Sequence, residues 1–356
     1  AVSGVSDTQT EKPDPWEAFT LADAYKARPP LEYIAGRMFE LPSLNIVYGA
    51  PGSLKSFILA DLAVSVAAGQ PWLTPAPWIK SNDLGIQTNK KPIMWLDFDN
   101  GRRRTHERFS ALARVRGLGI DAPIVYYSMP RPWLESTKIA DMGNLTLRIK
   151  RQGARLVVVD NLGLVSGDAD ENSSEMAAVM SQWRQLAEDS GAAVILIHHQ
   201  RKSNGMSGRA GENLRGHSSI EAALDLALLV EREEASEQIK IKATKARGEE
   251  VLPFSAAFTF ENNLDTGELQ HARFYGIATE DNQSGRAIEA AIMTALLGTS
   301  MNKTELKKAA QSLLKTDDGK APGINRISDY IARLVADGQL VEKPGANNTE
   351  RFYTRK

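Results

Sequence analysis

The chain is 356 residues long, which fits one large domain with an appended unit, or two to three ordinary domains. Hydrophobic residues make up 42% and charged residues 24% of it, as in soluble globular proteins. Its 43 Lys and Arg residues balance 44 Asp and Glu residues to a net charge of −1, so any nucleic-acid site must be a local basic patch. The lack of cysteine excludes disulfides, thiolate metal sites and cysteine nucleophiles, and the lack of a long apolar run predicts a cytoplasmic protein.

Residues 1–27 begin with a polar, proline-containing stretch, so we expect a flexible N-terminal segment. From residue 28 to 275, apolar strands first alternate with helices, which indicates a mostly parallel sheet covered on both faces. We expect strands over 44–48, 93–98, 124–127, 156–159 and 193–197, and helices over 55–68, 102–116 and 173–187. Strands with only short turns between them follow over 226–230, 238–244, 253–260 and 269–275, and they predict an antiparallel extension of this α/β core.

The C-terminal part has a different pattern. Residues 276–285 are polar and contain glycine, which predicts a linker. Residues 286–356 carry 12 Lys and Arg against 8 Asp and Glu, so this unit has a charge of +4 and leaves −5 for the rest of the chain. Its expected helices cover 286–297, 303–314 and 323–336, followed by a hairpin of 340–343 and 351–354. Three helices followed by a hairpin is the order of a winged-helix domain.

The clearest motif follows the first apolar strand and opens the first helix. It consists of Gly49, Ala50, Pro51, Gly52, Ser53, Leu54, Lys55 and Ser56. Glycines let backbone N–H groups turn toward phosphate oxygens, and the helix N-terminus adds partial positive charge. Lys55 would reach the β- and γ-phosphates of ATP, and Ser56 would bind Mg²⁺. Leu54 stands where the usual pattern has glycine, and the alternative interpretation is a plain turn before a helix.

Acidic residues end two of the expected strands. Asp160 follows strand 156–159 and would order Mg²⁺ beside the loop, although buried strands often end in a capping Asp. Asp97 and Asp99 alternate at the end of strand 93–98, so we expect both on one face, where a shared site would raise one pKa. One of them would polarise the attacking water as a general base. The alternative is a structural Asp-Asn-Gly turn.

Histidine and basic residues follow other strands. His199 ends strand 193–197 and either senses the γ-phosphate or is structural. The Gly-rich segment after it suits phosphate contacts along single-stranded DNA, or is a solvated loop; its basic residues are Arg201, Lys202, Arg209 and Arg215. Lys245 and Arg247 end a later strand, where they are either ordinary exposed cations or an arginine finger that reaches a neighbour's nucleotide.

In this order the motifs resemble a RecA-like ATPase core, and in particular the RepA-type hexameric helicases of plasmids and mobile elements in the DnaB/RecA group. GAPGSLKS resembles that family's Walker A motif and LVVVDNL its Walker B motif. HHQRK, LRGHSSIEAALDLALLVER and KATKARGEE resemble its sensor strand, its Gly-Ser helix with Asp and its trans-acting strand. The resemblance covers roughly residues 28–275 and implies ATP and Mg²⁺ as cofactors. Its functional positions fall on Lys55, Ser56, Asp99, Arg108, Asp160, His199, Lys245 and Arg247.

These observations predict an ATP-dependent DNA motor, a hexameric helicase or translocase that hydrolyses ATP between subunits. The C-terminal unit would contact DNA through Arg326, Arg333, Lys343 and Arg351, with Ile324, Ile327, Ile331 and Leu334 on its buried helix face, or it would dock a protein. Asp99 stands where the resemblance implies Glu, one methylene longer, so an ATP-gated DNA-binding or recruitment factor is an alternative. A small-molecule kinase is another, although the sequence has no evident lid or acceptor pocket.

Overall fold

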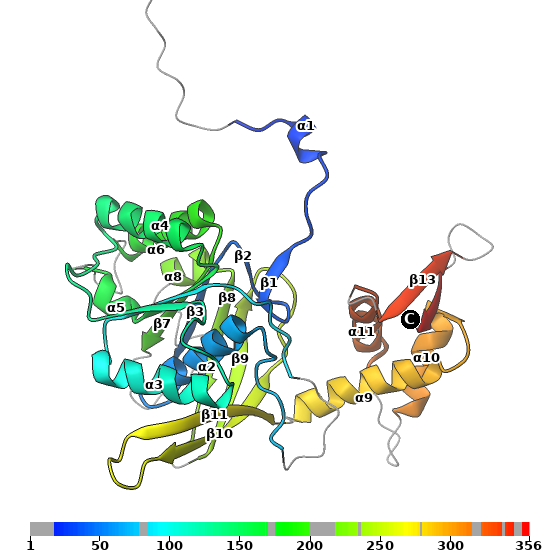
Figure 1. The fold of residues 1–356 in the computed structure, drawn as a ribbon. Coiled ribbons are helices and arrows are strands. Elements are labelled where there is room, and N and C mark those ends of the chain that lie inside the picture. Colours follow the sequence, from blue (N-terminus) through cyan, green and yellow to red (C-terminus); the bar gives the residue numbers. More distant parts are fainter. Residues whose placement is uncertain are drawn as a thin grey trace, which may run out of the picture. The chain divides into compact units, whose positions relative to one another are not determined.

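The computed structural model describes residues 18–77, 85–167, 169, 175–199, 218–233, 236–277, 280–314, 322–336, 339–344 and 351–355. The chain divides into two units, Ala1–Glu32 and Tyr33–Lys356. The first unit contains the short helix α1 (Leu21–Ala24). The second contains a large sheet with helices on both faces and a smaller group of helices and strands near the C-terminus (Figure 1).

A nine-stranded sheet runs in the order β11, β10, β9, β8, β3, β7, β6, β4, β5. The strands from β8 to β5 pair in parallel, and β9, β10 and β11 extend the sheet antiparallel. Every strand predicted for the core is present, which confirms the α/β fold with a mostly parallel sheet. The strands are β3 (Ser43–Gly49), β4 (Ile93–Asp97), β5 (Ile124–Ser128), β6 (Leu156–Asp160), β7 (Ala193–His199), β8 (Leu226–Glu231), β9 (Gln238–Ala246), β10 (Phe254–Asn262) and β11 (Leu269–Ile277).

Successive residues of the central strands pack into opposite cores. In β6, Leu156 and Val158 join the core on one face, whereas Val157 and Val159 join the core on the other. Both faces are buried, which is why the strand sequences are continuously apolar rather than alternating. Helices α2 (Lys55–Ala68) and α3 (Arg102–Val115) cover the first face, and α4 (Ile139–Gln152) and α6 (Glu175–Ser190) cover the second, with the short α5 (Leu162–Val165) and α8 (Ser218–Ala223) (Figure 1).

Helix α4 was not predicted from the sequence. Gly143, Asn144 and Thr146 are poor helix formers and weaken the local signal. Met142, Leu145 and Ile149 nevertheless lie on one face and are buried, so packing against the sheet stabilises the helix. A separate two-stranded sheet of β1 (Glu32–Ala35) and β2 (Met38–Leu41) was also not predicted.

The C-terminal group has its own apolar core. Its elements are α9 (Glu280–Ala295), β12 (Met301–Asn302), α10 (Lys303–Leu313), α11 (Ile324–Ala336), β13 (Leu340–Pro344) and β14 (Arg351–Arg355), with strand order β12, β14, β13. Asn302 and Glu305 form the predicted capping pair of α10. The prediction that 276–285 is entirely linker is wrong, because β11 extends to Ile277 and α9 begins at Glu280. An acidic residue favours a first helical turn, and the sequence starts there with Glu and Asp.

The inward face of α11 differs from the prediction at one position. Ile327, Ile331 and Leu334 are buried as expected, but Ile324 is 41% exposed because it begins the helix, where fewer neighbours cover it. No helix in the described part of the chain is both long and apolar enough to cross a membrane.

Candidate nucleotide-binding site

The motif loop joins the C-terminal end of β3 to the start of α2. Gly49 has a φ of +156°, and a Cβ there would lie 2.2 Å from the carbonyl oxygen of Val230, so no side chain fits. Gly52 has a φ of +79°, but a Cβ there would meet nothing within 4 Å. The backbone conformation at Gly52, rather than crowding, therefore favours glycine.

Leu54 adopts the left-handed conformation that the usual glycine at this position accommodates without strain. Its φ is 65° and its ψ 23°, which costs a residue with a Cβ about 1 kcal/mol or more. The side chain is half-buried and packs against the core on the α2 face. This packing offsets part of the backbone strain.

Lys55 begins α2 and turns back over the loop. Its Nζ donates hydrogen bonds to the carbonyl oxygens of Gly49 (2.9 Å) and Ala50 (2.8 Å) and lies 3.4 Å from the Ser53 hydroxyl. Only 3% of the residue is exposed. Burial lowers the pKa of Lys55 to about 8, although the carboxylates of Asp160 and Asp99 act in the opposite direction.

Asp97 and Asp160 end neighbouring strands and face each other in register, but their environments differ. Asp97 accepts hydrogen bonds from the backbone N–H groups of Asp99 and Asn100, the Asn100 amide and the Thr105 and Ser128 hydroxyls. Burial alone would raise the pKa of Asp97, but these hydrogen bonds outweigh it and lower that pKa. Burial raises the pKa of Asp160 to about 6, and the Ser56 hydroxyl partly opposes this.

The surroundings of Asp160 fit a divalent cation. Its Oδ2 accepts a hydrogen bond from the Asn100 amide at 2.9 Å, whereas its buried Oδ1 accepts none from any residue that the structure describes. The Ser56 hydroxyl is close enough to lower the Asp160 pKa. A carboxylate and a hydroxyl oxygen beside a phosphate-binding loop are ligands that suit Mg²⁺.

Asp97 and Asp99 do not share one site, so that prediction is wrong. Asp97 is buried and organises the turn into α3, because five donors converge on it. Asp99 lies beyond the end of β4, and its side chain is 43% exposed and 3.6 Å from the Nε2 of His199. Of the two acids, Asp99 is thus the one that is accessible to a reactant.

Arg108 lies on α3 beside these acids. Its guanidinium is 5.3 Å from the centre of the Phe57 ring, in the first turn of α2. Burial lowers the pKa of Arg108, while Asp160 and Asp97 act to raise it. The residues near the loop therefore comprise Lys55, Ser56, Asp99, Arg108, Asp160 and His199, which the sequence motifs predicted together.

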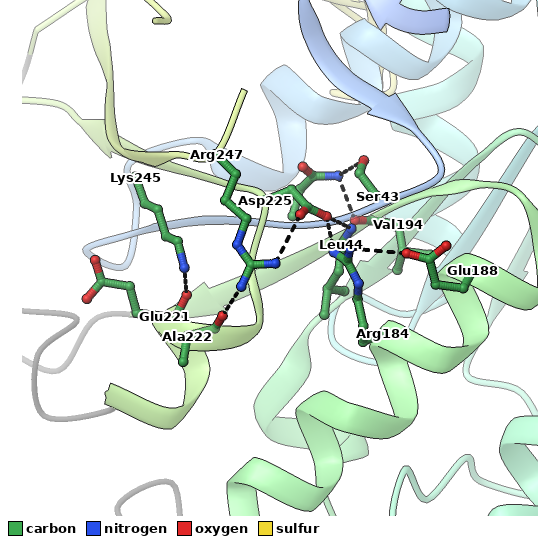
Figure 2. A network of polar contacts seen from close by, with 11 residues as sticks. Ser43, Leu44, Arg184, Glu188, Val194, Glu221, Ala222, Asp225, Lys245 and Arg247 are labelled. Carbon is green, nitrogen blue, oxygen red and sulfur yellow. Dashed lines mark hydrogen bonds and ion pairs between the residues drawn. The ribbon is translucent and has the colours of Figure 1, made fainter. Parts of the chain in front are cut away.

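Lys245 and Arg247 lie at the other end of the sheet strands (Figure 2). Ala246 is opposite Leu226, which is opposite Asn45 in β3, whereas the loop begins at Gly49. Four strand residues separate the two levels, a distance of about 13 Å. The predicted finger residues are therefore not brought together with the loop of their own chain.

The side chains of Lys245 and Arg247 contact their own chain. They donate to the backbone carbonyls of Glu221 and Ala222, respectively, at the end of α8. Arg247 also lies 3.5 Å from an Asp225 carboxylate oxygen, and Asp225 in turn contacts Arg184 and accepts the N–H of Leu44 (Figure 2).

The remaining predicted residues lie elsewhere or outside the described part. Arg326, Arg333, Lys343 and Arg351 are all exposed in the C-terminal group. Arg201, Lys202, Arg209 and Arg215, the proposed contacts to single-stranded DNA, lie outside the described residues. Sequence reasoning missed Arg232, which donates to the Gly52 carbonyl from the end of β8. No motif marks it, because its place depends on the pairing of β8 with β3.

Known ATPases share parts of this chain's fold and sequence. A solved ATPase domain of a helicase aligns with a TM-score of 0.47 and 13% identity over 65% of this chain and 84% of that one. The RadB recombinase aligns with a TM-score of 0.43 and 16% identity over 62% and 89%. A family described as an AAA domain matches residues 10–205, more than half of the chain. This match includes the loop, Asp99, Asp160 and His199, and it supports ATP binding and ATPase activity. The chain belongs to the AAA domain family.

Proposed function

We propose that the protein is an ATP-dependent DNA motor, a hexameric helicase or translocase that hydrolyses ATP at subunit interfaces. One observation carries the proposal: the phosphate-binding loop and the Lys245–Arg247 pair lie at opposite ends of the same sheet. A cation at the far end cannot reach the nucleotide of its own chain, but head-to-tail packing of copies would bring it to a neighbour's nucleotide. Such heterologous contacts close into rings when the rotation permits.

In this proposal ATP binds at residues 49–56, with Mg²⁺ held by Ser56 and Asp160. Lys55 exchanges its contacts with the loop carbonyls for phosphate oxygens. Asp99 orients the attacking water, and His199, 3.6 Å from Asp99, responds to the presence of the γ-phosphate. Arg247 and Lys245 of the adjacent copy stabilise the charge that develops on the transferred phosphoryl group.

DNA would contact two surfaces. The basic residues at 201–215 would follow the phosphates of a single strand. The C-terminal group has the helix and strand order of a winged helix, and the exposed side chains of Arg326, Arg333, Lys343 and Arg351 would contact a duplex there. Strand displacement driven by ATP and Mg²⁺ tests the motor, and an assembled protein that neither unwinds nor translocates would refute it.

A mixing experiment tests the division of the site between chains. Lys55→Ala removes the nucleotide-binding lysine, and Arg247→Ala removes the finger, so we expect each variant alone to lack ATPase activity. When the two are mixed in equal amounts, roughly a quarter of the interfaces pair an intact loop with an intact Arg247, so that share of activity returns. Arg151→Ala, an exposed arginine on α4, is the control that should remain active alone. Mixtures that assemble and stay inactive would show that the site is not shared.

The second candidate is an ATP-gated DNA-binding or recruitment factor without a motor stroke. The specific observation in its favour is the half-exposed Asp99, whose short side chain reaches less far toward a water than Glu. This function predicts slow hydrolysis and DNA affinity that depends on ATP. An unchanged DNA affinity in Lys55→Ala would exclude it, whereas ATPase stimulation by single-stranded DNA would exclude a small-molecule kinase.

A further inference from the structure

Arg232 reaches the phosphate-binding loop from a neighbouring strand of the same chain. Strand β8 pairs in parallel with β3, with Leu229 opposite Tyr48. The ends of the two strands are so close that the carbonyl of Val230 leaves no room for a Cβ at Gly49. Arg232 follows β8 directly, so the strand pairing places it beside the loop rather than at the far end of the sheet.

Three contacts define the position of the Arg232 side chain. Its Nη1 donates to the carbonyl oxygen of Gly52 at 3.4 Å, and its Nε donates to the carbonyl oxygen of Ser236 at 2.8 Å. The guanidinium also lies over the ring of Phe258, 4.9 Å from its centre. Ser236 and Phe258 both lie outside the loop, so they hold the guanidinium where it can fix the Gly52 carbonyl.

Fixing that carbonyl also fixes the neighbouring N–H. A trans peptide is planar, so the Gly52 carbonyl and the Ser53 N–H point in opposite directions. The Ser53 N–H donates to the carbonyl of Ala50 at 3.2 Å and closes the turn of the loop. The orientation of this peptide therefore determines which way the following loop N–H groups face.

Lys55 and Arg232 differ in what happens to them when a nucleotide arrives. Lys55 holds the carbonyls of Gly49 and Ala50, and under the proposed function it must leave them to contact phosphate. Arg232 has anchors of its own and need not move. It is therefore suited to support the loop carbonyls after Lys55 has turned away.

We propose that Arg232 is a positioning residue that holds the phosphate-binding loop in its nucleotide-binding shape from within the same chain. The inference rests on the proposed nucleotide binding. Because Arg232 acts on the loop rather than on the γ-phosphate, it supports ATP and ADP binding equally. Loss of this charge-assisted hydrogen bond should weaken affinity for both nucleotides about tenfold.

The test measures dissociation constants for fluorescent ATP and ADP with Mg²⁺, together with the melting temperature of the nucleotide-free protein. Arg232→Ala should weaken both affinities about tenfold with a nearly unchanged melting temperature, and Arg232→Lys should recover part of the loss by donating one hydrogen bond. Phe258→Leu removes the ring beneath the guanidinium and should give an intermediate loss. Arg148→Ala is the matched control, since that arginine lies 5.2 Å from the ring centre of Tyr127, which is on β5 rather than beside the loop.

Several results would overturn the inference. Affinities of Arg232→Ala within about twofold of wild type would leave Arg232 without a role, and an equal loss in Arg148→Ala would make the effect non-specific. A loss confined to ATP would make Arg232 a γ-phosphate ligand instead. Wild-type protein that binds no nucleotide would refute the proposed function itself, whereas binding by wild type with no change in Arg232→Ala refutes only the role of Arg232.

Discussion

Replacing Asp160 by Asn should stabilise the nucleotide-free protein while removing its activity. Asp160 is fully buried, and its pKa is about 6 rather than the ordinary 3.8. Asn has nearly the same shape and carries no charge. Its amide oxygen can still accept the hydrogen bond from Asn100, and its amide N–H₂ would occupy the place of the carboxylate oxygen that has no hydrogen bond.

The size of the effect follows from the two pKa values. A raised pKa means that the folded protein holds the Asp160 proton more tightly than the unfolded chain does. The stabilising contribution of that proton is fully present below pH 3.8 and is lost as the pH rises through about 6. The difference of about two pH units corresponds to about 3 kcal/mol. At pH 8 Asp160→Asn should therefore be more stable by up to that amount, and its melting temperature higher by roughly 6 °C.

The assay is urea or thermal unfolding between pH 4 and pH 8, in EDTA and without nucleotide, so that no cation stabilises the carboxylate. Asp97→Asn is the matched control with the opposite sign. Its carboxylate accepts hydrogen bonds from several donors, and an amide would turn an N–H₂ toward them, so we expect a loss of about 1–3 kcal/mol at pH 8. A stability gain of Asp160→Asn that is absent at pH 8, or that does not shrink toward pH 4, would refute the reasoning.

Three further predictions concern the loop and the core. At position 54, Gly should be more stable than Ala by about 1 kcal/mol, the reverse of ordinary helix propensity, because only Gly relieves the positive φ while both lose the leucine packing; equal unfolding free energies for Leu54→Gly and Leu54→Ala would contradict this. Affinity for ADP should fall as the pH rises above about 8, since Lys55 loses its proton there and phosphate prefers the cation, whereas a flat profile between about pH 7.5 and 9.5 in titration calorimetry would argue against it. Arg116→Ala should cost about 3–5 kcal/mol in urea unfolding because it leaves the buried Asp61 carboxylate, 2.8 Å from the guanidinium, without its partner; a loss below about 1 kcal/mol would show that the pair is not needed.

The sequence was most informative where local chemistry and burial agree. The strands β3, β6 and β7 are continuously apolar because both their faces are covered, and the loop after β3 needs glycine at Gly49 and Gly52 for reasons visible in the motif. Helix α4 was hidden because its propensity is poor and its stability comes from packing. A prediction from single-residue preferences cannot include contacts that exist only after the chain folds.

The candidate site was predicted in its membership but not in its geometry. Residue type and strand position indicated Lys55, Asp99 and Asp160, but period-two reasoning failed for Asp97 and Asp99. It failed because the chain leaves the strand at Asp97 and turns, so that the alternation no longer applies to Asp99. Arg232 could not be found at all, since its contact depends on which strands are neighbours.

The place of β7 between β3 and β6 sets the width of the site. The loop begins at the end of β3 and Asp160 ends β6, and both strands are hydrogen-bonded to β7 along nearly their whole length. Two strand spacings, about 10 Å, therefore separate the two sides, and His199 ends the strand that lies between them. The two sides cannot approach or separate unless backbone hydrogen bonds of β7 break. A protein with this arrangement can respond to its ligand by moving side chains and the loop, while the spacing between phosphate-binding and acidic residues stays constant.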